Sequence, residues 1–290
     1  MLKRHQSLFR LLERKDYRGG SKMNKTNSSG SKWLVTIIYF VMIATNAAAV
    51  LLPLNGMTTQ EVSDSYPNLF APAGLTFAIW SVIYLLLAGF VLYQWLKPSA
   101  GSILSNPAVG NKVRNVFIVS SILNSIWLVV WQYLQIDLSV VIMLVLLVTL
   151  IYVNRILANE PLTKREYVFV RLPFSVYFGW ITIATIANIT AFLVDKNIAF
   201  LQDNQVFWTV AVLIIGLLII TTTILRNRDI AYGLATLWAY YGILNKHQAA
   251  DGWDGAYPPI ILTVVICLGL LAIVCIYELV LFFKRKKSVI

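Results

Sequence analysis

Long apolar runs alternate with short polar segments along most of the 290-residue chain. Most runs approach or exceed the roughly 20 residues that an α-helix needs to cross a bilayer. The pattern therefore predicts an all-α integral membrane protein, a helical bundle of about eight transmembrane helices. The expected spans are Trp33–Leu54, Leu75–Leu96, Val113–Tyr133, Leu138–Leu157, Val168–Val194, Val206–Leu225, Ile230–Leu244 and Pro259–Phe283.

The first run has a second interpretation. A basic segment, an apolar run and then Ala47-Ala48-Ala49 also fit a cleavable signal peptide. The run continues past that candidate cleavage site, so a spanning helix is the preferred interpretation. Cleavage would leave the rest of the topology unchanged.

Residues 1–32 are polar and basic and contain too few apolar residues to form a core, so we expect a disordered cytoplasmic tail. Codons for Arg18-Gly19-Gly20 can resemble a bacterial ribosome-binding site just before Met23. We therefore hypothesise that translation starts at Met23 and not at Met1. The intact mass of the native protein tests this, since a mass that includes residues 1–22 would end the idea.

Composition supports a membrane protein, because 58% of the residues are hydrophobic and 13% are charged. Soluble domains carry about 25% charged residues. The net charge of +11 lies in short segments between the apolar runs, so membrane orientation explains it better than nucleic acid does, and no nucleic-acid partner is expected.

The distribution of basic residues also predicts topology. With the N-terminus inside and eight spans, every Lys and Arg except Lys196 and Lys246 falls on the inner side. The seventh span, Ile230–Leu244, is short, but omitting it would put the terminal Lys-Arg-Lys-Lys outside. We therefore expect a multi-pass protein of the cell membrane with both termini in the cytoplasm.

Three of the expected helices carry aromatic and polar residues on one face, at the spacing of three and four that an α-helix brings together. A loop with two prolines, Pro67–Gly74, precedes the first of these helices. Lipid requires only apolar side chains, so the stripes either pack helices, anchor them at the interface or line a pocket. The stripes are Phe77, Trp80, Tyr84 and Ala88; Asn124, Trp127 and Trp131; and Pro173, Tyr177, Trp180, Ala184 and Asn188.

These residues resemble the tryptophan-rich sensory protein family, TspO/MBR, whose animal members are the translocator proteins. The resemblance includes the Pro67–Pro72 loop, Asn124 with Trp127 as an Asn-x-x-Trp in the third helix, and the Pro, Trp, Ala and Asn of the fifth helix. It covers about residues 33–194, the five helices of that family. The loop lacks the family's Trp-Tyr pair and its Lys-Pro, the Phe77-to-Trp80 spacing is about one residue shorter, and the last three spans have no counterpart.

The resemblance implies a five-helix core over 33–200 with a pocket for a tetrapyrrole, a sterol or an aromatic drug-like molecule, roofed by the loop. Residues 201–290 would add three helices and a short basic tail, and we expect 1–200 to fold as a unit. The expected ligand-binding residues are Phe77, Trp80, Tyr84, Asn124, Trp127, Trp131, Tyr177, Trp180, Ala184 and Asn188.

This pattern favours a membrane-embedded binding or sensory protein for an apolar or aromatic small molecule. The alternatives are a transporter of a small amphipathic compound and a membrane enzyme acting on a bound porphyrin or lipid. No cofactor is required, a tetrapyrrole is one candidate ligand, and the expected partners are the bilayer, the ligand and, as a further option, a second copy in a homodimer.

Catalytic chemistry has little support in the sequence. His5 lies in the tail and His247 in an expected outer loop, so no catalytic or metal residues are proposed. Cys267 and Cys275 are about 12 Å apart along one helix, too far for a disulfide. Asn46 either bonds between helices or faces the pocket. Interfacial anchoring is the expected role of Trp33, Trp95, Trp208 and Trp253.

Overall fold

The structure is a computed structural model that describes residues 29–52, 54–96 and 102–287. The proposed tail and the question of Met1 against Met23 lie almost wholly outside these residues; only 29–32 are included, and they form the start of the first helix. The described chain is helical and contains no strand, so the predicted all-α membrane bundle is confirmed.

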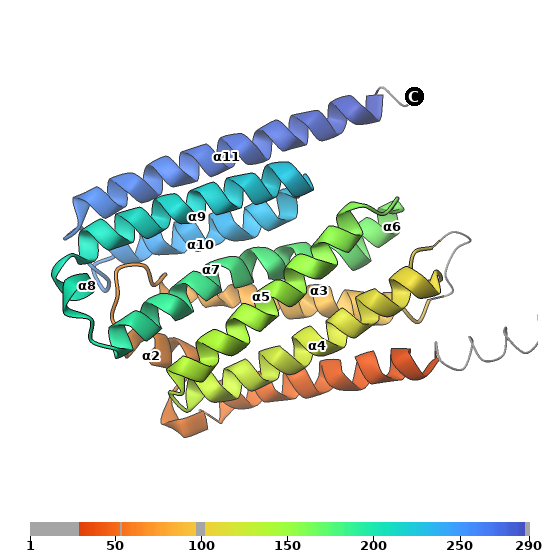
Figure 1. Ribbon diagram of the computed structural model, residues 1–290, viewed down its shortest axis with the longest axis horizontal. Helices are drawn as coiled ribbons and strands as arrows, with labels where there is room; N and C mark the ends of the chain where they lie inside the picture. Colours follow the sequence, from red (N-terminus) through yellow and green to blue (C-terminus); the bar gives the residue numbers. More distant parts are fainter. Residues whose placement is uncertain (1–28, 53, 97–101, 288–290) are drawn as a thin grey trace, which may run out of the picture.

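Eight long helical segments run along the length of the bundle (Figure 1). Within the described residues, seven segments are long and apolar enough to cross a membrane. These are Ser29–Leu51; η2 (Gly74–Ala78) with α3 (Ile79–Tyr93); α4 (Pro107–Gln132); α5 (Ile136–Ala158); α6 (Lys164–Glu166), η3 (Tyr167–Arg171) and α7 (Leu172–Asp195) as one run; α9 (Gln205–Asn227); and α11 (Pro258–Lys287).

The eighth segment, α10 (Ile230–Gln248), corresponds to the short seventh span. This helix is less apolar than the other seven segments, because polar residues such as Asn245 and Lys246 occupy its last turns. It packs instead between α7 and α11, with Tyr232 and Tyr240 fully buried. A helix surrounded by protein does not have to present an apolar surface to lipid on every side.

The helices form two groups that meet at α7. Helices α9, α10 and α11 lie together along one side of the bundle, and Ser29–Leu51 lies beside α4 on the other (Figure 1). Helix α5 packs against α4 and α7, and α10 packs against α7. The first and last described helices have their free ends at the same end of the bundle, as an even number of crossings requires.

Close approach of α10 to α7 depends on a glycine. A Cβ atom on Gly179 would lie 2.6 Å from the carbonyl oxygen of Tyr232 and 2.9 Å from the Cβ of Ala235. Such distances are shorter than normal contacts, so a larger residue would separate the helices. Small residues serve this role at helix interfaces in membranes.

The outward surface of the long helices is largely aliphatic, as contact with a bilayer requires. Leu218 of α9 is 61% exposed and Ile273 of α11 is 63% exposed. Short elements close the opposite end from the chain termini: η1 (Leu54–Gly56), α2 (Thr59–Asp64) and α8 (Ala199–Asp203). Helix α2 begins with a capping box between Thr58 and Glu61.

Candidate functional site

The three aromatic stripes converge inside the bundle, and Trp80 lies at their centre. Its ring is stacked on Tyr84 and meets one aromatic ring from α4 and two from α7. The ring centroids lie 5.6 Å from Tyr84, 6.0 Å from Trp127, 6.0 Å from Tyr177 and 6.1 Å from Trp180. These separations are typical of favourable aromatic pairs.

A cavity of about 40 Å³ lies among these rings. The loop forms one wall through Asn68, Ala71 and Pro72, and α2 contributes Thr59 and Ser63. We call this space the aromatic cavity. Of the ten residues expected to bind a ligand, seven line it: Phe77, Trp80, Trp127, Trp131, Trp180, Ala184 and Asn188.

The other three expected residues do not line the cavity but form a polar cluster beside Trp80. The Tyr84 hydroxyl donates to Oδ1 of Asn46, and Nδ2 of Asn46 donates to Oδ1 of Asn124 at 2.9 Å. Asn46 therefore bonds between helices, the first of its two alternatives. The Tyr177 hydroxyl faces Asn124 without making a hydrogen bond of standard geometry.

Three buried donors that line the aromatic cavity have no hydrogen-bond partner among the described residues. They are the indole N–H of Trp127, the indole N–H of Trp180 and the Nδ2 amide of Asn188. Oδ1 of Asn188 already accepts from the Ser139 hydroxyl at 3.1 Å, and Trp131 donates to the Thr59 carbonyl at 3.2 Å. Buried donors without partners are rare because each costs about 1–3 kcal/mol, so these three groups stand out among the residues that line the cavity.

The loop that walls the cavity is itself ordered by Asn68. Its Oδ1 accepts from the backbone N–H of Phe70 at 3.1 Å and of Ala71 at 2.9 Å, and its Nδ2 donates to the Tyr66 carbonyl. The Asn68 side chain thus gives the backbone groups of the loop the hydrogen-bond partners that a regular helix or strand would provide. Asn68, Leu69, Phe70 and Ala71 are all buried, so the loop is part of the packed interior.

The loop is also held by α10, which the sequence did not suggest. The Ala73 N–H donates to the Gly242 carbonyl at 2.9 Å, and the Trp238 indole donates to the Thr76 carbonyl at 2.9 Å. Nε2 of His247 lies 2.9 Å from the Leu69 carbonyl oxygen. The expectation that His247 lies in an outer loop is wrong, because the residue is buried in the last turn of α10.

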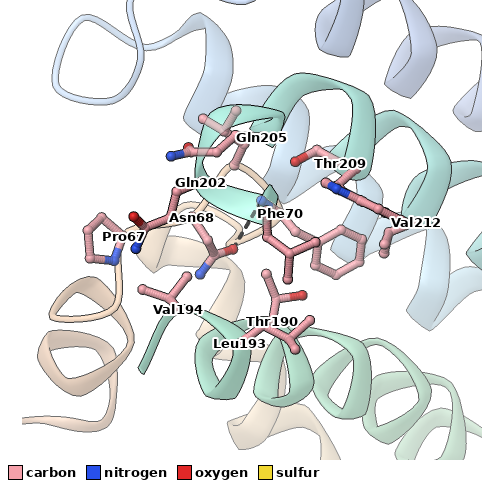
Figure 2. Close-up of a pocket in the computed structure, with 13 residues that line it drawn as sticks. Pro67, Asn68, Phe70, Thr190, Leu193, Val194, Gln202, Gln205, Thr209 and Val212 are labelled. Carbon is pink, nitrogen blue, oxygen red and sulfur yellow. Dashed lines mark hydrogen bonds between the residues drawn. The ribbon is translucent and has the colours of Figure 1, made fainter. Parts of the chain in front are cut away.

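A second cavity, of about 110 Å³, lies on the other side of the loop. Figure 2 shows loop residues Pro67, Asn68 and Phe70 between side chains of α7 and side chains of α8 and α9. We call this space the outer cavity. Asn68 lines both cavities, so the loop is their common wall. The lining from the helices includes Thr190, Leu193, Val194, Gln202, Gln205, Trp208, Thr209 and Val212.

Trp208 lines the outer cavity, although the sequence favoured an interfacial anchor. Its ring packs on Phe200 and Phe207, and its indole N–H is buried without a partner among the described residues. Trp33 and Trp95 meet edge to face near the free end of the first helix, where the Trp95 indole donates to the Thr36 hydroxyl. Trp253 packs on Tyr257 beside His247.

The described residues contain no group of three His, Cys, Asp or Glu that could hold a metal. Cys267 and Cys275 are buried free cysteines, as expected from their spacing. The residues that line the aromatic cavity offer stacking on indole rings and on the phenyl ring of Phe77, together with unpartnered donors on two indoles and one amide.

The profile of one protein family matches the chain. The family is described as TSPO-like protein, and the match covers residues 32–277. It extends beyond the five helices that carried the resemblance and includes α9, α10 and most of α11. Searches of curated proteins and of solved structures found no significant match.

Proposed function

Since the chain belongs to the TSPO-like protein family, we propose that it is a membrane protein that binds a small apolar or aromatic molecule at the aromatic cavity. The observation that carries the proposal is the set of three unpartnered donors among stacked rings, from Trp127, Trp180 and Asn188. The expected ligand has a flat apolar body and at least one acceptor oxygen or nitrogen, as tetrapyrroles and many aromatic compounds have.

Size sets a condition on this proposal. The cavity of about 40 Å³ holds only a water or two, whereas pockets for drug-sized ligands have about 300–1,000 Å³. A larger ligand therefore requires the common wall between the two cavities to move. Asn68, which lines both cavities, is the loop residue that would have to shift.

Binding is tested by identifying the pigment or lipid that purifies with the full-length protein and by titrating a free-base porphyrin. A porphyrin in the aromatic cavity should quench tryptophan emission, because four indoles line or lie beside it. Quenching that saturates at one porphyrin per chain supports the proposal. Unchanged emission at saturating porphyrin, with no compound purified, would contradict it.

The same preparation separates binding from its alternatives. In liposomes, passage of the bound compound at a rate set by the protein would favour a transporter. Conversion of the bound compound would favour an enzyme. We propose a binding or sensory role because binding needs only aromatic rings and hydrogen-bond donors around a cavity. The residues that line the site supply both.

We also propose that both termini are cytoplasmic in the cell membrane. The support is the concentration of Lys and Arg at the end of the bundle where the described chain begins and ends. A reporter fused after Ile290 should be cytoplasmic, and one inserted near Asp251 should be outside. A cytoplasmic reporter at Asp251 would overturn the topology.

A further inference from the structure

A third cavity, of about 180 Å³, lies between α5 and α9, and α7 and α10 also contribute to its lining. It is near the end of the bundle that carries most of the basic residues. Helices α5 and α9 make little contact with each other there, so the cavity forms a gap between them. Its lining combines apolar residues with hydroxyls and arginines: Leu147, Ile151, Arg155, Phe178, Thr182, Ile219, Thr222, Thr223, Arg226, Asn227 and Tyr232.

The two arginines give this gap its charge. Arg155 in the last turn of α5 and Arg226 in the last turn of α9 are both exposed. Neither belongs to an ion pair found among the described residues. Asp229, three residues from Tyr232 of the lining, is buried and accepts from the Ser175 hydroxyl and the Tyr232 N–H, and it does not line the gap. The guanidinium groups are therefore available to an anion.

The interior of the gap adds a polar group below the arginines. The Tyr232 hydroxyl is buried and makes no hydrogen bond of standard geometry among the described residues, although it lies near Thr182 and Thr223. Farther along α5 and α9 the outward residues are aliphatic, such as Val148 at 63% exposure and Ile215 at 55%. A ligand with a charged oxygen-rich head and an apolar tail matches both parts.

We propose that this gap binds the headgroup phosphate of an anionic phospholipid. Arg155 and Arg226 would contact the phosphate, the hydroxyl-lined interior would receive headgroup oxygens, and the acyl chains would lie on the aliphatic surface of α5 and α9. A lipid is favoured over a soluble phosphate because the gap continues into a surface that only lipid covers. An anionic headgroup is favoured over phosphatidylcholine because choline would bring a cation towards two guanidinium groups.

The test is a titration of purified full-length protein in detergent with phosphatidylglycerol or phosphatidylcholine, followed by native mass spectrometry. We expect phosphatidylglycerol to bind more tightly to one site per chain. The Arg155→Gln/Arg226→Gln variant should bind it about twenty-five-fold more weakly, taking about fivefold for each arginine. The matched control is Lys164→Gln/Arg165→Gln, which removes the same charge from exposed residues at the same end of the bundle outside the gap; it should stay within about twofold.

Equal losses in the two double variants would overturn the proposal, because charge alone would then explain binding. Displacement of the lipid by inorganic phosphate alone would also overturn it in favour of a soluble anion. If the arginine variant fails to fold, Ile219→Trp offers a second test, since it fills the gap from a half-exposed lining position without changing charge. Unchanged phosphatidylglycerol affinity in Ile219→Trp would contradict the placement.

Discussion

The aromatic cavity and the outer cavity share one wall but are built in different ways. The aromatic cavity is lined mainly by residues that repeat on single helix faces, with stacked rings and three unpartnered donors. The outer cavity is lined by a loop and by the ends of α7, α8 and α9, and it has one unpartnered donor, on Trp208. The outer cavity is larger, yet its lining is less specific. The two cavities therefore differ in the number of unpartnered donors as well as in volume, and the proposed binding at the aromatic cavity rests on that contrast.

The largest expected effect tests whether the two cavities depend on the same helices. Truncation after Asp203 removes α9, α10 and α11, and with them the three α10 bonds that hold the loop. From these contacts we now expect loss of folded protein, whereas the sequence favoured an independent core over 33–200. Monodispersity and helical circular dichroism in detergent measure the outcome, with truncation after Arg285 as the control. A 1–203 fragment that folds and binds ligand would show instead that the five-helix core folds independently of the last three helices.

A smaller effect is expected from Gly242→Ala, which acts where α10 contacts the end of the loop and η2. A Cβ at this position would overlap the side chain of Thr76, whose carbonyl accepts from Trp238. Overpacking of this kind costs about 1–3 kcal/mol, so the thermal midpoint should fall and porphyrin affinity should fall with it.

Gly269→Ala is the matched control for that substitution, because a Cβ there meets no atom within 4 Å. It should leave stability unchanged or raise it by up to about 1 kcal/mol through helix propensity. A Gly242→Ala protein as stable as the control would show that the loop can shift at little cost in stability. The common wall could then move easily to admit a ligand.

The next effect concerns α2, which touches the aromatic cavity but not the outer one. Thr58→Ala removes the side-chain bond of the capping box that begins α2, at a cost of about 1 kcal/mol, and leaves the bond from the backbone N–H of residue 58 to Glu61. Hydrogen bonds from Thr58 lower the pKa of the Glu61 carboxyl below its ordinary value of 4.5. The stabilisation by this carboxylate is therefore present at neutral pH and is lost as the pH falls below about 4.5.

Thermal unfolding of Thr58→Ala and wild type between pH 7 and pH 4 checks both statements. The difference in midpoint should be largest at pH 7 and should shrink at the acid end. A difference that grows as the pH falls would contradict the role assigned to Glu61.

Helix periodicity predicted more of the molecule than loop chemistry did. The long helical segments follow from the lengths of the apolar runs. The shared helix faces of the residues that meet at Trp80 follow from spacings of three and four, which hold whatever the tertiary context. The bond from His247 to Leu69 joins residues far apart in sequence, and no local pattern records it.

Trp208 shows the same limit. Its position near a span end is typical of an interfacial anchor, and only the packing of α8 and the loop makes it line a cavity. Gln205, Thr209 and Val212 share α9 with Trp208, but the rest of the lining comes from the loop, α7 and α8, which no pattern within α9 records.

The most direct measurement compares porphyrin affinity in Trp127→Leu and Trp208→Leu, which alter the two cavities separately. Trp127→Leu should weaken binding by a few-fold to about tenfold, since one aromatic contact contributes about 0.5–1.5 kcal/mol beyond its area. Trp208→Leu should change affinity by less than about twofold. Trp95→Leu, which lines neither cavity, serves as the control for loss of an indole. If Trp208→Leu has the larger effect, or if Trp127→Leu matches the control, the ligand does not occupy the aromatic cavity and the proposed function is contradicted.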